Sequence, residues 1–381
     1  MTAFPGAAVS GHAFAGVFSA PSYTGAMLRF ESALARAQAH EGIIPGDAAD
    51  EITHACAGLD LDFDAVAAEG RRAASLAVPV VERLRAAVGE SHRGHVHFGA
   101  TSQDVLDTAT ALCLKTCLDE ADRVLEGAIR RLARHAREHR ATPMVARTLM
   151  QPAVPVTAGL RIARWAMALA QDRERLAEAQ AVGLAIQLGG PVGALEALAE
   201  RGAAVRHRLA LDLGLADAPS WHVHRNAWVD LLGRIAQAVL TTGKIARDLA
   251  LSSQPEVGEM REAPAGQGGR SSAMPHKRNP AGCARALAAA LRVPGIMATV
   301  HASALAEHER SLGGWQAELA SVPELADTLG TALDFLAGIG DALELDAVRM
   351  RANLATHGLG DPVAWMPHAV DEILAALATH T

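Results

Sequence analysis

The 381-residue sequence is poor in aromatic residues, which make up 3% of the chain as five Trp, one Tyr and seven Phe. β-Strands draw on aromatic and β-branched residues, whereas the Ala and Leu that dominate here favour helices. Hydrophobic residues nevertheless account for 50% of the sequence. A chain of this length therefore has enough apolar side chains for a large core, and its composition predicts an all-α protein.

Basic charge, cysteine and uninterrupted apolar runs are also scarce. The formal net charge of −7 argues against nucleic acid as the main partner. Four Cys residues in so long a chain do not form a disulfide framework, and we expect them to be small core residues. The first 20 residues lack the basic start of a secretory signal, and charges interrupt the long apolar segments. We therefore expect a cytoplasmic protein without a membrane partner.

Helical periodicity divides the chain into three predicted regions. Residues 1–100 form a small helical region with helices near 24–41, 47–57 and 64–88. Residues 101–341 form a central bundle of long helices, which we place at about 103–139, 152–186, 227–253, 281–307 and 316–341. Residues 342–381 form a short C-terminal tail. Helices this long and apolar need partner subunits to bury their remaining faces, so we predict a homo-oligomer.

The segment 103–139 carries the clearest packing signal. Ala and Leu alternate along it at spacings of three and four residues, at Ala111, Leu114, Leu118, Ala121, Leu125, Ala128 and Leu132. This spacing is typical of the seam between long packed helices. Thr101 and Asp104 have the spacing of a helix-capping pair and predict the start of the helix.

Three polar loops interrupt the predicted bundle, at residues 95–104, 146–157 and 266–280. Each precedes a long helix, and the free N–H groups of a helix N-terminus suit anionic ligands. His95 and His97 alternate within the first loop, but no third ligand has metal-site spacing, so we predict neither a metal nor a cofactor.

The three loops also carry motifs. "GATSQD" (99–104), "RTLMQPAVP" (147–155) and "SSAMPHKRNP" (271–280) resemble, in order, the three signature regions of the fumarase/aspartase superfamily. The resemblance implies a homotetramer built on a bundle of long helices, with each active site shared among three subunits. It also implies a small polycarboxylate substrate, and a C–O or C–N bond formed or broken β to a carboxylate through an aci-carboxylate intermediate.

The resemblance further implies the site residues. Ser272, the second serine of the mobile loop, corresponds to the catalytic base, and Ser271 directly before it is also expected to be a catalytic residue. Gly268 and Gly269 are expected to let this loop close over the site. The substrate-binding residues implied are His97, Thr101, Ser102, Gln151, Lys277, Asn279 and Arg310. For Ser271 a capping role, and for His97 a structural role, remain open alternatives, and the segment "WHVHR" (221–225) either lines the site or plugs the bundle end.

Two departures from the superfamily pattern indicate the reaction. Leu149 stands where adenylosuccinate lyases carry a His that protonates the leaving nitrogen, and Ala284 replaces the Glu that assists it. A carboxylate leaving group needs no such acid, so the sequence resembles the lactonising branch, which acts on 3-carboxymuconate. The substrate anion would suit Arg147, Lys277, Arg278 and Arg310. An adenylosuccinate-type C–N lyase that releases fumarate and a non-catalytic helical scaffold are the alternatives.

Two further departures concern the loop and the tail. Arg270 lies directly before the paired serines, where the superfamily pattern more often has Gly. The superfamily usually continues through a C-terminal helical domain, so the resemblance implies that residues 342–381 are a shortened form of it.

Overall fold

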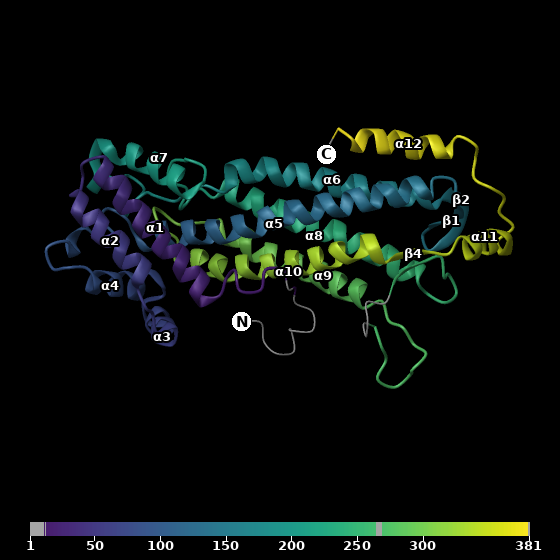
Figure 1. Ribbon diagram of the computed structural model, residues 1–381, viewed down its shortest axis with the longest axis horizontal. Helices are drawn as coiled ribbons and strands as arrows, with labels where there is room; N and C mark the ends of the chain where they lie inside the picture. The colour runs from purple at the N-terminus through teal and green to yellow at the C-terminus, as the bar shows by residue number, and fades with distance from the viewer. Residues whose placement is uncertain (1–10, 12, 264–268, 380–381) are drawn as a thin grey trace.

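Long helices lie side by side in an elongated bundle (Figure 1). The computed structural model describes residue 11 and residues 13–263 and 269–379. The bundle helices are α5 (Ser102–Glu138), α6 (Ala158–Gly183), α8 (Asn226–Ser252), α9 (Ala281–Ser303) and α10 (Gly314–Ala342). Neighbouring bundle helices pack on one another, α9 against α8 and α10, and α5 against α6 and α10. The predicted all-α class with a long central bundle is confirmed.

The longest helix, α5, begins and packs as its sequence predicts. The backbone N–H of Thr101 donates to the Asp104 carboxylate at 2.9 Å, which closes the capping pair. The helix has 37 residues, and at 1.5 Å per residue it is about 55 Å long. Every residue of the Ala/Leu seam is at least 98% buried, so the periodicity marked the face that packs on the neighbouring helices.

One end of the bundle carries the small helices of the N-terminal region. These are α1 (Ala20–His40), α2 (Gly46–Gly58), α3 (Phe63–Ala73), α4 (Ala77–Ala87) and a short 3-10 helix at Arg93–His95. A second 3-10 helix (Glu196–Arg201) and α7 (Gly202–Leu213) come from the segment between α6 and α8, and α7 packs on α1. This end therefore combines two stretches of chain that lie more than a hundred residues apart.

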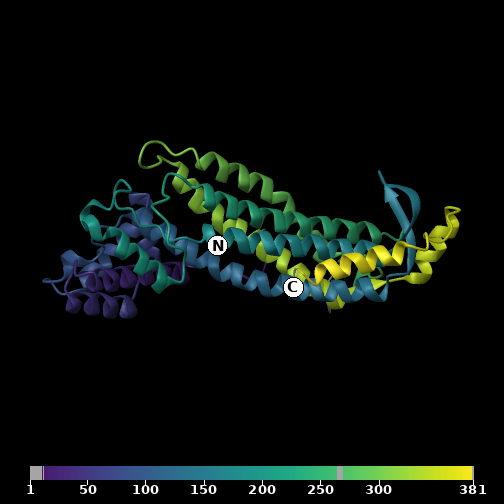
Figure 2. The ribbon, with the colours of Figure 1, turned by 90° about the horizontal axis from the view of Figure 1, so that it is seen from above.

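The opposite end carries short strands and the C-terminal helices (Figure 2). β1 (Pro143–Thr148) and β2 (Gln151–Thr157) form an antiparallel hairpin between α5 and α6. β3 (Met260–Glu262) pairs antiparallel with β4 (Leu343–Leu345), which directly follows α10. The chain then forms α11 (Ala347–Thr356), which packs on β1, and α12 (Met366–Leu377), which packs on α6.

Two predicted helix boundaries were wrong. Residues 64–88 form two helices, because Ala74 adopts the left-handed region with φ 51° and ends α3. Residues 152–157 belong to strand β2 rather than to the following helix. Pro152 and Pro155 lack the N–H that a helix needs and disfavour helical geometry in the residue before them.

The cysteines and the most apolar helix are both accounted for by the core. All four Cys residues are buried and free, as predicted. Among the described helices, α9 is long and apolar enough to meet the length and composition of a membrane span. It packs between α8 and α10, and its two arginines pair with acidic residues of α10, Arg285 with Asp334 at 3.0 Å and Arg292 with Asp327 at 3.1 Å.

Candidate active site

Two of the predicted site residues meet at the N-terminal end of α5. The guanidinium of Arg310 donates to the Thr101 hydroxyl at 3.1 Å, the Gln103 amide oxygen at 3.3 Å and the Gly190 and Pro191 carbonyls at 3.3 and 3.0 Å. Within the described part of the chain, these acceptors are all neutral oxygens. The side chain is thus held in place while its positive charge stays available to an anionic ligand.

Asp104 fixes the loop that approaches Arg310. Its buried carboxylate accepts bonds from the Gln187 amide at 2.9 Å and from the backbone N–H groups of Gly189 and Gly190 at 2.9 and 3.0 Å. Burial raises the pKa of Asp104 to about 6, although these donors and the Thr101 N–H act in the opposite direction. The loop carbonyls that orient Arg310 are therefore tied to the start of α5, where Ser102 lies half-buried.

His97 lies in the turn before α5 and contacts a buried acid. Its Nδ1 atom is 2.6 Å from the Glu31 carboxylate, and Glu31 is 1% exposed. Burial alone would lower the pKa of His97, but the charge of Glu31 and the hydrogen bond to it outweigh burial and raise that pKa. The backbone of His97 is left-handed, with φ 61°, a conformation that non-glycine residues rarely adopt. The surrounding structure therefore holds this imidazole in a defined orientation beside the Thr101 turn.

A buried ionic network lies beneath this end of α5, and sequence reasoning did not identify it. The Arg225 guanidinium donates to Asp107 at 2.8 Å and to Glu318 at 2.9 Å. The indole N–H of Trp228 donates to Glu318 at 2.9 Å, and that of Trp315 donates to Asp107 at 3.0 Å. The network joins α5, α8 and α10, so Arg225, the last residue of "WHVHR", plugs the bundle end rather than facing a ligand.

Four predicted residues lie on the loop that leads into α9. Ser272, Lys277 and Asn279 are exposed, and Ser271 is half-buried. The Ser271 hydroxyl accepts the N–H groups of Ala273 at 3.4 Å and Met274 at 3.1 Å, which is a turn-capping arrangement. Ser272 is the exposed member of the pair.

Gly269 fixes the base of the same loop. The Asn279 N–H donates to the Gly269 carbonyl at 2.7 Å, and the backbones of Arg270 and Arg278 pair antiparallel. With φ 72°, Gly269 has a conformation that favours glycine, and a Cβ there would lie 2.2 Å from the Asn279 oxygen. The expected contribution of Gly268 to loop closure lies outside the described residues.

Gln151 starts strand β2 next to the tip of the hairpin. Gln151 is exposed, and the tip residues Leu149 and Met150 are 96% and 66% exposed. Arg147, on the preceding strand, donates to the fully buried Glu259 at 2.8 Å, so its charge is already neutralised within the chain.

The predicted residues therefore form two groups at opposite ends of the bundle (Figure 1). His97, Thr101, Ser102 and Arg310 lie where α5 begins. The other group, at the end where α5 finishes and α9 begins, contains Gln151, Ser271, Ser272, Lys277 and Asn279. Residues 271–279 precede α9 and Arg310 follows it, so the 23 residues of this helix, about 35 Å in length, lie between them. One chain alone cannot bring the serine loop to Arg310.

Comparison with known proteins gives consistent matches. The family model described as "Lyase" matches residues 9–295. A 3-carboxy-cis,cis-muconate cycloisomerase of Bradyrhizobium diazoefficiens is 46% identical over 340 residues, which cover 87% of this chain and 75% of that protein. A nitrosuccinate lyase of Streptomyces davaonensis is 40% identical over 355 residues, covering 88% and 73%. The crystal structure of beta-carboxy-cis,cis-muconate cycloisomerase from Acinetobacter calcoaceticus has a TM-score of 0.86 at 33% identity and covers 98% of this chain and 88% of that one.

Proposed function

This chain belongs to the fumarase/aspartase superfamily of lyases, and from that premise we propose that it interconverts 3-carboxy-cis,cis-muconate and 4-carboxymuconolactone. The reaction belongs to the protocatechuate branch of the β-ketoadipate pathway. We propose that the protein works as a soluble cytoplasmic homotetramer without a cofactor.

The hairpin tip is the observation that carries this choice of reaction. Leu149 and Met150 project there beside Gln151, and neither side chain has a proton to give. Cleavage of a C–N bond benefits from an acid at the departing nitrogen, because an amide or amine anion is a poor leaving group. A lactone instead releases a carboxylate, which is stable without protonation. An apolar tip is therefore compatible with lactone chemistry and poorly suited to amine release.

The N-terminal region supports the same choice. The superfamily's nucleotide-using members carry an Arg-Tyr contact, and the corresponding segment here contains Tyr23. Its hydroxyl contacts the Leu106 carbonyl at 3.1 Å and the Thr110 hydroxyl at 2.9 Å, both on α5. Tyr23 thereby joins α1 to the bundle, and its hydroxyl is committed to that packing.

In the proposed reaction, one substrate carboxylate attacks the diene carbon β to a second carboxylate, and the new C–O bond closes the ring. The intermediate is an aci-carboxylate, whose extra charge Lys277 and Asn279 would stabilise. Ser272 then gives a proton to the α carbon, and in the reverse direction it removes that proton. Arg310, Thr101, Ser102, His97 and Gln151 would bind the third carboxylate and orient the attacking one. Intramolecular attack needs no base to activate the nucleophile and benefits from proximity.

Assembly of this site requires more than one subunit. Arg310 and Ser272 belong to groups at opposite ends of the bundle, so different chains would have to supply them. The outer face of α9 is suitable for such contacts: its exposed residues carry no carboxylate, Lys or Arg and are mostly small or apolar, at Ala284, Leu291, Pro294, Gly295, Ala298, Thr299, His301 and Ala302. A solvent-facing helix normally carries charge on that side. Partner subunits would cover this face.

The test follows the absorbance of 3-carboxy-cis,cis-muconate with the purified protein. Ring closure removes the conjugated diene, so the ultraviolet absorbance should fall rapidly. Ser272→Ala should abolish the fall, whereas Ser271→Ala should reduce it less, because the Ser271 hydroxyl caps a turn. Full turnover by Ser272→Ala would contradict the role given to this serine, and no turnover by the wild type would contradict the reaction.

A C–N lyase is the second candidate, because the nitrosuccinate lyase relative is 40% identical. The same preparation should be offered nitrosuccinate and adenylosuccinate, with release of fumarate as the readout. Fumarate from either compound, together with an unchanged muconate spectrum, would favour this alternative. Absence of every activity would favour a non-catalytic helical scaffold.

A further inference from the structure

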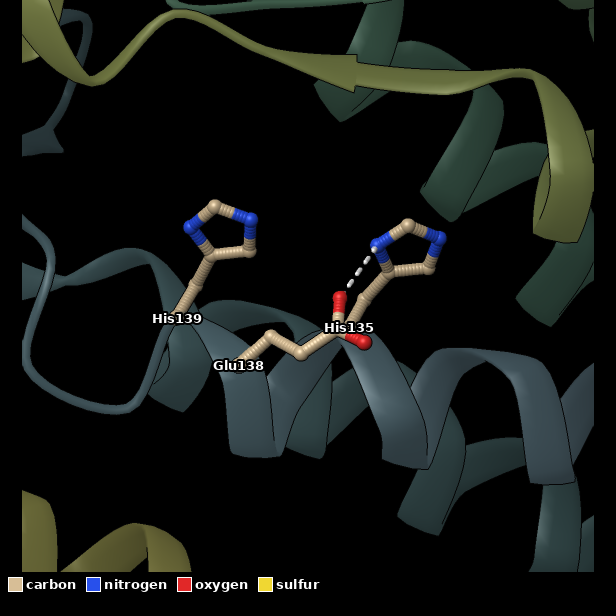
Figure 3. A group of neighbouring side chains, drawn as sticks. All are labelled: His135, Glu138 and His139. Atoms are coloured by element: carbon tan, nitrogen blue, oxygen red, sulfur yellow. Dashed lines mark ion pairs between the residues drawn. The ribbon is translucent and has the colours of Figure 1, made fainter.

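The C-terminal end of α5 carries three metal-ligating side chains on one face, at His135, Glu138 and His139. Positions three and four residues apart are neighbours on a helix surface. One ligand atom of each side chain lies within 4.8 Å of the other two. Figure 3 shows the two imidazoles side by side above the helix, with the Glu138 carboxylate next to the His135 ring.

The contacts of each side chain are compatible with binding an ion. The His135 Nδ1 atom lies 3.9 Å from the Glu138 carboxylate. The His139 Nδ1 atom lies 3.1 Å from the Thr142 hydroxyl, which orients the ring and leaves its Nε2 atom for a ligand. Both histidines are half-buried and Glu138 is exposed, so the group opens to solvent on one side.

We propose that His135, Glu138 and His139 bind a zinc ion or a similar transition metal, with water as the remaining ligand. Bonds of about 2.1 Å in tetrahedral geometry place ligand atoms roughly 3.4 Å apart. The present limit of 4.8 Å therefore has to shorten by little more than an ångström. Side chains on one exposed helix face can make that adjustment.

The ligand atoms select the kind of metal. The Arg134 Nε atom lies 4.0 Å from Glu138, and Arg137 is on the same helix turn. These positive charges act alike on every divalent cation, but Mg²⁺ and Ca²⁺ depend on several oxygen ligands and the group supplies one carboxylate. Imidazole nitrogens instead suit Zn²⁺, Ni²⁺ and Cu²⁺. With two imidazoles and one carboxylate, this group suits these transition metals.

The site lies at the base of the β1–β2 hairpin. The His139 carbonyl accepts the Gly159 N–H and the Thr142 carbonyl accepts the Ala158 N–H, both at 2.9 Å. The turn at residues 139–142 therefore ties the end of α5 to the start of α6. An ion bound to His139 would stiffen this turn. Its role would be structural, because the metal takes no part in the proposed reaction.

Calorimetric titration of Zn²⁺ into chelator-treated full-length protein tests the proposal. We expect one ion per chain with micromolar affinity, and loss of binding in His135→Asn and His139→Asn. Thr142→Val removes only the partner that orients His139 and should weaken binding by about 10-fold to 100-fold. The matched control is His207→Asn, since His207 is also paired with one carboxylate, Asp217 at 3.1 Å, but belongs to no such group of three among the described residues. It should bind zinc as the wild type does.

Two results would overturn the proposal. One is no zinc binding by the folded wild type, and the other is an affinity for zinc in both histidine variants that equals that of the wild type. If a histidine variant fails to fold, the visible spectrum of Co²⁺ added to the wild type shows whether the site binds a metal. Tetrahedral coordination by nitrogen and oxygen gives intense visible absorption. A spectrum of hexa-aqua Co²⁺ alone would reject the site. None of these measurements depends on enzyme activity, so they stand apart from the test of the proposed reaction.

Discussion

At the residue scale, the partners of Arg147, Arg225 and Arg310 indicate which of these three arginines is available to bind substrate. Arg225 lies between two carboxylates, and Arg147 pairs with the buried Glu259. These charges are compensated, and removing one partner would leave an uncompensated buried charge. Arg310, in contrast, is held by the neutral oxygens of Thr101, Gln103 and the 190–191 backbone. An anionic substrate supplies the charge that its surroundings lack.

Replacing Arg310 by Met should therefore damage catalysis far more than folding. We expect kcat/KM to fall by about 10²-fold to 10³-fold, as when one charge-stabilising donor is lost. The matched control is Arg201→Met, because Arg201 is likewise held by neutral backbone oxygens, of Glu41 at 2.8 Å and Gly42 at 3.0 Å, but lies outside the site. Steady-state kinetics and thermal unfolding of both variants check this, and equal activity losses would contradict it.

The His97–Glu31 pair predicts a pH dependence of stability. The folded pKa of His97 is raised above its ordinary value of about 6.5. Its contribution to stability is then fully present below pH ~6.5 and is lost as the pH rises through the folded pKa. The stability difference between the wild type and His97→Gln should shrink over that interval, as measured by urea unfolding at fixed protein concentration.

Glu31→Gln provides the control for this effect. Without the Glu31 charge, burial dominates and the pKa of His97 falls below its ordinary value. The contribution of His97 should then increase as the pH rises towards neutrality, which is the opposite slope. If wild type and Glu31→Gln showed the same slope, the pair would not be the cause.

At the scale of elements, the hairpin tip combines backbone strain with exposed apolar side chains. Leu149 and Met150 have φ values of 49° and 66°, and they form the two-residue turn between Thr148 and Gln151. Such turns favour Asn-Gly, whose residues adopt positive φ at little cost. Retaining a strained, apolar pair beside Gln151 is consistent with a role for these side chains inside another subunit's site.

The double substitution Leu149→Asn with Met150→Gly tests that role. Relief of left-handed strain should stabilise the fold by about 1–2 kcal/mol. Inside another subunit's site, burial of the Leu149 side chain would contribute roughly 1.5–3 kcal/mol. Its loss should therefore lower kcat/KM by about 10-fold to 100-fold. Leu211→Asn, at a residue 69% exposed on α7, should change neither. Unfolding midpoints and muconate kinetics are the readouts, and a more stable variant with full activity would contradict the interpretation.

Elements with regular periodicity could be predicted from the sequence, whereas elements that depend on local backbone conformation could not. The Ala/Leu spacing of α5 and its Thr101 cap directly reflect helix geometry, so the sequence located this helix to within a residue. The β1–β2 hairpin was partly assigned to the next helix, because its two strands carry no clear alternation and the tip lacks Gly or Asn. The left-handed Ala74 that separates α3 from α4 has no signal in its side chain.

At the scale of the whole molecule, the parts that sequence reasoning missed are those that depend on distant contacts. Arg225 contacts Asp107 across 118 positions and Glu318 across 93. No local pattern pairs such residues, and they meet only because three bundle helices converge. The motif residues could be found through resemblance, but their separation into two groups at opposite ends of the bundle is visible only in the structure.

That separation predicts complementation between two inactive variants. Ser272→Ala loses the proposed base at one end of the bundle, and Arg310→Met loses the proposed anion contact at the other. If each site takes these residues from different chains, mixed oligomers should contain some sites in which both are wild type. Random assortment in equal amounts would leave roughly one quarter of the sites intact. The measurement is muconate turnover after the two proteins are unfolded, mixed and refolded together.

Each variant refolded alone is the control and should stay inactive. A mixture of Ser272→Ala with Lys277→Ala should contain no intact site and should also stay inactive. Both residues lie on one loop and would enter a site from the same chain. Every such site inherits one defect or the other. Recovery by the first mixture and not by the second would assign Arg310 and Ser272 to different subunits of one site. Equal failure of both mixtures would mean that a single chain completes its own site, contrary to the separation imposed by α9, which is about 35 Å long.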